Sequence, residues 1–424
     1  MKIQDTANTA HTMRFKGDGV IWAVFIALCI VSIIEVFSAS SSMSFKSGNY
    51  LGPVLKHCGL LGFGVLAMIG TMNISCRWFK ALTSAALVLS VCLLIGVFFL
   101  GESTNGSQRW MSIMGIQFQP SELAKGALVL SVAKILSAMQ TDTGTEKNAF
   151  KYVMIVSAVI IIPIAFENLS TAALLSFVVI VMMFVARVPA RQLGRLIGAI
   201  LALVFGALLL VELVGKAPDK TDDDRRNMTE QVGEKPKESV LDKVFHRAGT
   251  WKNRINKFTD KKQIDPKDVD LDKDAQVAHA NIAIASSNVV GKGPGNSVER
   301  DFLSQAFSDF IYAIIIEETG IEGAFVVLFL YIILLFRTAT IANRCANAFP
   351  ALMIMGFAVL LVVQALFNMS VAVGLVPVTG QPLPLISKGG TSTIVNCVYI
   401  GMILSVSVSA KKRDKEKTTS VPVA

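Results

Sequence analysis

The side chains that could do chemistry gather first in Ser308–Gly320, where three carboxylates enter a run that otherwise has the composition of a membrane helix. They are Asp309, Glu317 and Glu318. Acidic side chains in a membrane segment are energetically costly and usually functional, so Asp309 is our first candidate for a catalytic base. Because Ser-Asp at a helix start is also a common capping sequence, a purely structural cap is the alternative for Asp309.

Helix geometry separates these three acids. At about 1.5 Å per residue, a helix from Ser308 to Leu335 exceeds the roughly 30 Å hydrocarbon layer, so we expect Asp309 at the outer interface and the glutamates two turns deeper. Glu317 lies about 80° around the helix from Asp309, and Glu318 lies opposite it. The three acids therefore cannot share one site, and we interpret Glu317 and Glu318 as polar lining or internal bracing.

A glycine-rich turn, Gly291–Ser297, precedes this helix. Three glycines and a proline expose backbone N–H groups that can hold a phosphate, and Lys292 adds positive charge. The distance to a Lys-Ser or Lys-Thr pair is not that of a P-loop, so an ordinary glycine turn is the favoured alternative. Lys292 and Ser297 are nevertheless candidate substrate contacts.

A second polar stretch, Asn105–Lys125, is an outer loop that runs into a helix. Arg109 and Lys125 could hold an anionic headgroup, with Trp110 at the membrane interface. Glu122 lies three residues before Lys125, on the same helix face. A capping acid and a lysine that reaches up to the interface explain this pair equally well.

A third polar stretch, Pro377–Ser392, contains three prolines and three glycines and leads into the last apolar run. Such irregular backbone is tolerated at membrane depth only where it packs on protein or lines a cavity. Lys388 would add another cation on the outer face.

Composition explains what must position these stretches. Of the 424 residues, 53% are hydrophobic and only 17% are charged, so we expect a membrane protein. The net charge of +9 lies mostly in short loops and at the C-terminus, which is a topology signal and argues against a nucleic-acid partner. The six cysteines lie in or beside apolar runs without CxxC spacing, which predicts neither disulfides nor a metal site. The first apolar run lacks a cleavage site and is expected to remain as an anchor.

The apolar runs predict an all-α, polytopic fold with about ten transmembrane helices. The predicted spans are 20–38, 54–72, 80–100, 121–138, 151–166, 168–186, 193–214, 308–336, 351–374 and 391–410. An even number of spans puts both termini on one side. The basic residues of alternate connections fall on that side, which makes it cytoplasmic; they are Arg77, Lys80, Arg187, Arg191, Arg195, Arg337, Arg344 and the tail Lys411–Lys417.

The predicted organisation follows from these spans. It consists of a cytoplasmic tail at 1–19, helices one to seven at 20–214, a large extracytoplasmic loop at 215–307, helices eight to ten at 308–410 and a basic cytoplasmic tail at 411–424. Residues 216–275 within the large loop are rich in Lys, Asp and Glu, which is typical of a solvated insert. All three chemically suggestive stretches then lie on the outer side.

Three motifs together, NGSQRW…QPSELAK, GKGPGNS…SDFIYAIIIEETG and PVTGQPLPLISKGGTS, closely resemble the SEDS family of shape, elongation, division and sporulation proteins. The resemblance covers nearly all the chain outside the N-terminal tail and residues 216–275, and it favours the division branch over the elongation branch. It implies polymerisation of peptidoglycan glycan strands from lipid II, with the family's motif aspartate at Asp309. The family's loop residues fall on Arg109, Trp110, Gln119, Pro120, Ser121, Glu122 and Lys125.

The resemblance also implies partners and one departure. The expected partners are a class B penicillin-binding protein, which is a transpeptidase, and other membrane proteins of the division machinery. Where the family commonly has Pro-Asp-Leu-Gly-Thr, this chain has Glu167-Asn168-Leu-Ser-Thr171. Any role of that family aspartate is therefore open at Asn168, and Glu167 could supply the charge from next door.

The chemistry implied is glycosyl transfer at the outer leaflet of the cytoplasmic (inner) membrane. A diphosphate leaves readily, so the reaction needs one base and cations to hold the diphosphate. Asp309 suits the base, and the candidate cations are Arg109, Lys125, Lys292 and Lys388. A single carboxylate suits inverting transfer, and no ligand cluster demands a metal, although a divalent Mg or Mn ion bridging Asp309 and the diphosphate fits. The alternatives are a lipid II flippase, a scaffold for the transpeptidase and an elongation-type polymerase.

Overall fold

The computed structural model describes residues 16–47, 52–100, 102–104, 107–113, 116–142, 144–214, 275–303 and 308–419. Within these residues the fold is all-α and polytopic, as predicted. Seven of the described helices are long and apolar enough to cross a membrane, and Leu169–Val185 is a shorter apolar helix. The part of the predicted insert at 216–274 lies outside the described residues.

Each predicted span coincides with one helix of the structure. These helices are α1 (Gly19–Ser47), α2 (Gly52–Met72), α3 (Cys76–Leu100), α4 (Pro120–Ala138), α5 (Lys147–Glu167), α6 (Leu169–Val185), α7 (Ala190–Val214), α11 (Ile311–Asn343), α12 (Ala348–Ala372) and α13 (Thr391–Thr419). The predicted boundaries are wrong where α1 and α13 continue well beyond their apolar runs. A helix that leaves the hydrocarbon layer keeps its internal hydrogen bonds, so polarity does not end it.

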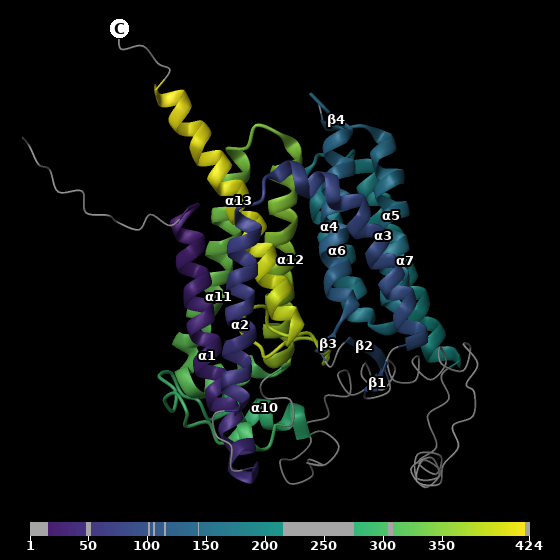
Figure 1. Ribbon diagram of the computed structural model, residues 1–424. Helices are drawn as coiled ribbons and strands as arrows, with labels where there is room; N and C mark the ends of the chain where they lie inside the picture. The colour runs from purple at the N-terminus through teal and green to yellow at the C-terminus, as the bar shows by residue number, and fades with distance from the viewer. Residues whose placement is uncertain are drawn as a thin grey trace, which may run out of the picture.

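The helices stand side by side in one bundle (Figure 1). The start of α1 and the end of α13 lie at one end of the bundle, and the strands β1–β3 lie at the other. α12 is central: 72% of its membrane window is buried inside the protein, compared with 22% for α3. Because α12 contacts α11, α4 and α6, it can join polar groups from both halves of the chain.

Short strands, a short helix and a 3-10 turn lie at the two ends of the helix bundle. At the end opposite the start of α1, the predicted loop after the third span contains β1 (Glu102–Thr104), β2 (Ser107–Ile113) and β3 (Ile116–Phe118), which form an antiparallel sheet in that order. The large outer segment, predicted as loop to residue 307, contains the helix α10 (Ala275–Ala285) and the 3-10 turn η1 (Glu299–Asp301). At the opposite end, β4 (Gln140–Thr141) and β5 (Gly144–Thr145) form a small hairpin.

The predicted continuous helix at 308–336 is wrong, because α11 is broken at Gly320. This residue has φ 72° and ψ −172°, a conformation that favours glycine. A Cβ atom on Gly320 would lie 2.1 Å from the carbonyl oxygen of Val289, so only glycine fits there. Tyr312 donates its hydroxyl to the carbonyl of Ala324 at 3.1 Å, although a straight helix would separate these residues by about 18 Å. The two parts of α11 therefore lie beside each other near the break.

The break also corrects the predicted depth of the acids. α1 runs from Gly19 toward the end of the bundle that holds β1–β3, so the residues it contacts can be ordered along the bundle axis. Ser32 of α1 donates to the carbonyl of Ile386, in the loop that holds Ser308, whereas Ser38 donates to Glu318. Ser38 lies about 9 Å further along α1 than Ser32. Glu318 is therefore nearer the end of the bundle that holds β1–β3 than the segment that carries Asp309, which reverses the order expected from one continuous helix.

Candidate functional site

Asp309 lies in a half-buried segment that is held by its backbone. The amide of Asn368 donates to the Asp309 carbonyl at 2.9 Å, and Ser387 Oγ donates to the Ser308 carbonyl at 2.7 Å. Ser308 also donates to the Asp309 carboxylate at 3.1 Å. The N-cap of α11 is Phe310, without a side-chain cap, so the capping alternative for Asp309 is wrong.

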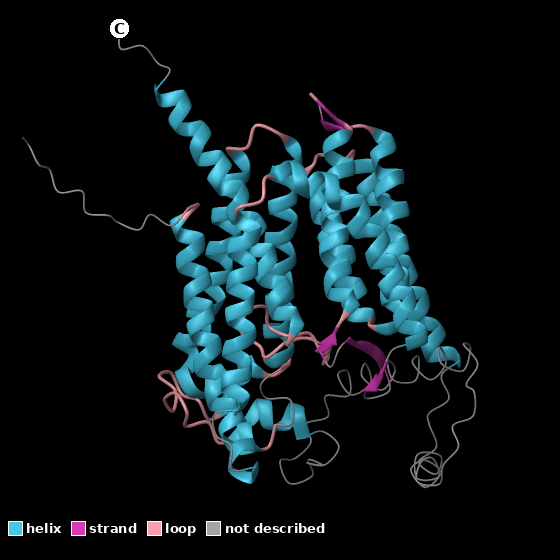
Figure 2. Ribbon diagram, viewed as in Figure 1, coloured by secondary structure: helices cyan, strands magenta, loops and turns pink. Residues whose placement is uncertain are grey.

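The proline-rich loop between α12 and α13 runs into the protein rather than over it (Figure 2). Gln381, Leu383, Leu385, Ile386 and Ser387 are all buried. Its carbonyl groups are bound by side chains of the membrane helices, since Tyr331 donates to Pro384 and Ser32 donates to Ile386. The prediction that this irregular segment packs on protein is confirmed, and the packing satisfies backbone groups that lipid could not.

Glu122 and Lys125 form a buried ion pair on α4. Lys125 is 1% exposed and Glu122 is 3% exposed, and the ammonium lies 2.8 Å from a carboxylate oxygen. Lys125 also donates to the side-chain oxygen of Gln364 at 2.9 Å. The alternative of a lysine that reaches to the membrane interface is therefore wrong. The prediction that the two residues share one helix face is confirmed.

A chain of amide side chains connects this ion pair to the loop beside Asp309. Gln364 donates to the carbonyl of Pro382 at 3.1 Å, and Gln381 donates to Thr171 Oγ1 on α6 at 2.6 Å. Asn368 donates to the carbonyl of Gln381 at 2.7 Å. The buried lysine–carboxylate pair and the Asp309 segment are thus joined to the same loop through Gln364 and Asn368, which lie one turn apart on α12.

The remaining predicted site residues lie on β2, at the start of α4 and in the loop itself. Gln119 is the half-buried N-cap residue of α4, and Ser121 is buried in its first turn. Trp110 is half-buried on β2, and the side chain of Arg109 lies outside the described residues. Burial lowers the pKa of Lys388, and the neighbouring Lys56 lowers it further. Thr391, at the start of α13, donates to the carbonyl of Gln117 at 3.3 Å and joins the loop to β3.

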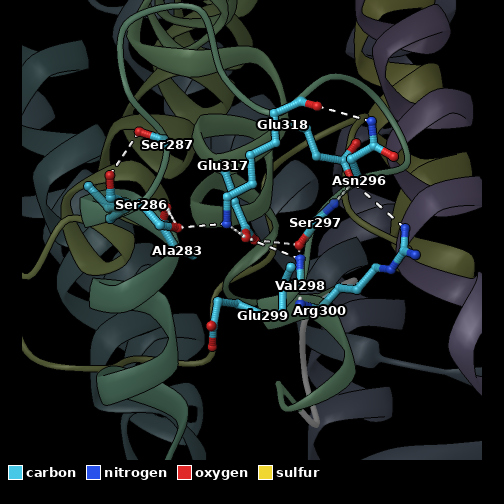
Figure 3. A network of polar contacts seen from close by, with 12 residues as sticks. Ala283, Ser286, Ser287, Asn296, Ser297, Val298, Glu299, Arg300, Glu317 and Glu318 are labelled. Carbon is cyan, nitrogen blue, oxygen red and sulfur yellow. Dashed lines mark hydrogen bonds and ion pairs between the residues drawn. The ribbon is translucent and has the colours of Figure 1, made fainter.

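The turn Gly291–Ser297 is occupied by the two glutamates of α11 rather than open (Figure 3). Lys292 pairs with a Glu317 oxygen at 2.6 Å, and Ser297 donates to the other oxygen. The backbone N–H groups of Gly295 and Ser297 donate to the Glu318 carboxylate at 2.9 and 3.4 Å. Both glutamates are 0% exposed, so internal bracing describes them.

The same turn replaces helix hydrogen bonds that the break at Gly320 removes. The backbone N–H groups of Lys292 and Gly293 donate to the carbonyls of Glu317 and Glu318 at 3.0 and 2.8 Å. In an unbroken helix those carbonyls would accept from residues four further on. The turn and the break are therefore one structural unit, which we call the glutamate clamp: residues 291–298 with Glu317, Glu318 and Gly320.

Several residues of the site escaped the sequence analysis. Arg300 donates to Ser38 at 2.9 Å and to the carbonyl of Gly295 at 2.7 Å, and it lies 4.0 Å from Glu318. Gln364 and Asn368 could have been found, because a polar residue inside an apolar helix is a functional signal. Arg300 carries no such signal, since it lies in a polar loop.

Glu167 and Asn168, which stand where the family commonly has Pro-Asp, lie at the junction of α5 and α6. Asn168 is the N-cap of α6, and its side-chain oxygen accepts from the backbone N–H of Thr171 at 3.3 Å. Glu167, the last residue of α5, is buried. Because Thr171 Oγ1 also accepts a hydrogen bond from the side chain of Gln381, the first turn of α6 contacts the network around the proline-rich loop.

The fold and the site define a polytopic membrane protein with a buried polar network around the loop between α12 and α13. A sequence model of the cell cycle protein family FtsW/RodA/SpoVE matches residues 18–412, and the chain belongs to this family. Among curated relatives, the probable peptidoglycan glycosyltransferase FtsW of Enterococcus hirae is 28% identical over 95% of this chain and 94% of its own. Peptidoglycan glycosyltransferase MrdB of Escherichia coli K12 is 25% identical over 92% of this chain and 94% of its own.

Solved structures support the same fold. A chain of a peptidoglycan synthase complex aligns with a TM-score of 0.70 at 22% identity, covering 93% of this chain and 98% of that one. RodA of Thermus thermophilus aligns with a TM-score of 0.60 at 22% identity and the same coverage of each chain. The family resemblance seen in the three motifs is confirmed by the family match over residues 18–412.

Proposed function

We propose that this chain is a peptidoglycan glycosyltransferase that polymerises lipid II into glycan strands at the outer face of the cytoplasmic membrane, in septal wall synthesis during cell division. The observation that carries the proposal is the shared loop at 377–390, which is hydrogen-bonded both to the Asp309 segment and to Gln364, the partner of Lys125. The FtsW relative, which is named a probable peptidoglycan glycosyltransferase, and the MrdB relative, which is named a peptidoglycan glycosyltransferase, support it.

In the proposed reaction, a sugar hydroxyl of one glycan attacks the anomeric carbon of a second, diphosphate-linked sugar. A C–O bond forms, the bond from the anomeric carbon to the phosphate oxygen breaks, and the diphosphate leaves with the electron pair. Asp309 takes the hydroxyl proton. One carboxylate is sufficient, because no covalent glycosyl intermediate forms and the anomeric carbon inverts.

The leaving diphosphate needs positive charge that is already in position. We assign this role to Arg109 on β2 and Lys388 in the loop. Lys125 is buried and already paired with Glu122, so we assign it to holding the site together from within. Lys292 pairs with Glu317 and Ser297 donates to the same carboxylate, so we assign these two residues to bracing.

A divalent cation, Mg or Mn, remains part of the proposal. Among the described residues no group of three or more His, Cys, Asp or Glu side chains could hold a metal ion. Magnesium in phosphate sites commonly uses one or two carboxylates together with substrate oxygens, which the half-buried Asp309 and a diphosphate could supply. Chelation with EDTA followed by Mg or Mn addition tests this assignment.

The proposed setting follows from charge placement and from the family. Both termini are assigned to the cytoplasm because the basic connections share their end of the bundle, and the large loop is assigned to the outside. The proposed partners are a class B penicillin-binding protein and other division proteins. The peptidoglycan synthase complex that shares this fold supports such a partner.

The test is polymerisation of labelled lipid II in detergent by the protein purified with its transpeptidase. Asp309→Asn should lower the rate of glycan formation at least 100-fold, because proton transfer by a positioned base contributes about 10²–10⁴-fold. Asp301→Asn is the matched control, since Asp301 is exposed on η1. Equal polymerisation by Asp309→Asn and wild type would refute the assignment of the base. Transport of lipid II across vesicles without polymer formation would favour the flippase.

A further inference from the structure

We propose that Asn368 and Ser387 are positioning residues that fix the orientation of Asp309. The inference rests on the proposed function, because it gives these two side chains a role in the same reaction. Asn368 lies outside the three motifs and Ser387 lies within the third, and both act on the backbone of Ser308 and Asp309 rather than on substrate.

The backbone of these two residues has no regular structure to hold it. α11 begins at Ile311 with Phe310 as N-cap, so the carbonyls of Ser308 and Asp309 precede the helical hydrogen bonds. Ser387 holds the Ser308 carbonyl at 2.7 Å, and Asn368 holds the Asp309 carbonyl at 2.9 Å. With both carbonyls fixed, the peptide planes on either side of Asp309 are held, and the direction of its Cα–Cβ bond is fixed.

Asn368 is suited to this role by its two N–H donors. One donates to the Asp309 carbonyl, and the other donates to the Gln381 carbonyl at 2.7 Å. A flipped amide would place its own oxygen against two carbonyl oxygens, so the contacts fix its orientation. The residue is 1% exposed, and its Oδ1 atom is buried without a hydrogen-bond partner. A buried acceptor left unpaired is costly, which indicates that the side chain is kept for its two donors.

Ser387, in the loop between α12 and α13, holds the second carbonyl, that of Ser308. It is 2% exposed, donates to Ser308 and accepts from the backbone N–H of Leu383 at 2.8 Å. Its hydroxyl therefore joins the proline-rich loop to the Asp309 segment. The two contacts come from different elements, α12 and the loop, so a movement of either element would turn Asp309.

The first test is steady-state kinetics of lipid II polymerisation by the complete complex. Asn368→Asp keeps the shape of the side chain but removes both donors, and Ser387→Ala removes the hydroxyl. We expect each to lower kcat about 100-fold, as misplacement of a reacting group by about 1 Å does, with KM for lipid II within threefold. Ser387→Thr keeps a hydroxyl donor and should restore most of kcat. Asn347→Asp is the matched control, because Asn347 is exposed at the other end of α12.

A double variant distinguishes positioning from general damage. In an Asp309→Asn background, Asn368→Asp should lower the residual rate less than threefold, because it acts through Asp309. A kcat within twofold of wild type for Asn368→Asp, or an equal loss with and without Asp309, would overturn the proposal.

If the wild-type protein forms no glycan, the proposed function is refuted. A second readout then still tests the positioning role. Hydrogen exchange in detergent should be at least tenfold faster at 308–314 and 381–387 in Asn368→Asp than in Asn347→Asp. Equal exchange at both segments would overturn the positioning role.

Discussion

The glutamate clamp provides the sharpest prediction, because each contact of Glu318 is defined. Its carboxylate accepts backbone N–H groups from Gly295 at 2.9 Å and Ser297 at 3.4 Å, together with the Ser38 hydroxyl. Glu318→Gln keeps the size of the side chain but replaces one acceptor oxygen with a donor. That nitrogen must then face an N–H group or a hydroxyl.

The magnitude follows from these contacts. A hydrogen bond to a charged group contributes about 1.5–3 kcal/mol, and Glu318 is fully buried, so loss of one or two contacts should cost about 3 kcal/mol. This loss lowers the free energy needed to open the turn locally, because the turn is held mainly by the two glutamates. Since about 1.4 kcal/mol corresponds to a factor of ten, exchange at the Gly293, Gly295 and Ser297 amides should accelerate about 100-fold.

The assay is hydrogen exchange of residues 291–298 by mass spectrometry on the protein in detergent. Glu322→Gln is the matched control, because Glu322 is exposed on the same helix just beyond the break. The control should leave exchange of the turn within twofold of wild type. If Glu318→Gln also leaves it within threefold, the carboxylate does not hold the turn and the reasoning fails.

Three further predictions concern other contacts. Lys125→Met should lower the unfolding free energy by about 3–5 kcal/mol, because Glu122 would remain buried without its cation; an unchanged Tm in detergent, relative to Lys134→Met, would contradict this. Burial acts to raise the pKa of Asp18, but the hydrogen bonds and charge of Arg337 outweigh it and hold that pKa below its ordinary value of 3.8. The Asp18–Arg337 pair therefore stabilises the folded protein above pH 3.8, and this stabilisation is lost as the pH falls through the lower folded pKa of Asp18. The Tm difference between wild type and Asp18→Asn should shrink over that range. A difference that grows on acidification would exclude this pair as the cause. Gly320→Ala should reduce the yield of folded protein, because the residue has positive φ and its Cβ would meet Val289, whereas Gly70→Ala, which meets nothing within 4 Å, should be tolerated; equal Tm values and yields would refute the close approach.

The helices and the candidate base could be predicted from sequence for physical reasons that are local. A run of about 20 apolar residues has to form its hydrogen bonds internally in lipid, so composition alone predicts a helix. An acid such as Asp309 beside such a run is costly and draws attention without any structure. The proline-rich loop was predicted to pack on protein by the same reasoning, and it does.

Other features could not be predicted, because they depend on contacts between distant residues. Lys125 and Gln364 are 239 residues apart in the chain, and only packing of α4 against α12 brings them together. The capping and interface explanations for Asp309 and Lys125 were reasonable for isolated helices. They are wrong because neighbouring elements supply other partners.

By itself, the sequence determined the membrane helices and the family, and it predicted their sidedness and a candidate base, since these depend on local hydrophobicity, charge and motif. Only the tertiary structure decided the depth and orientation of the acids. The approach of Val289 and Gly291 to Gly320 breaks α11, and the turn at 291–298 takes over the hydrogen bonds of Glu317 and Glu318. A helix period read along one segment cannot reveal such a break, because its cause lies about 30 residues away in the chain.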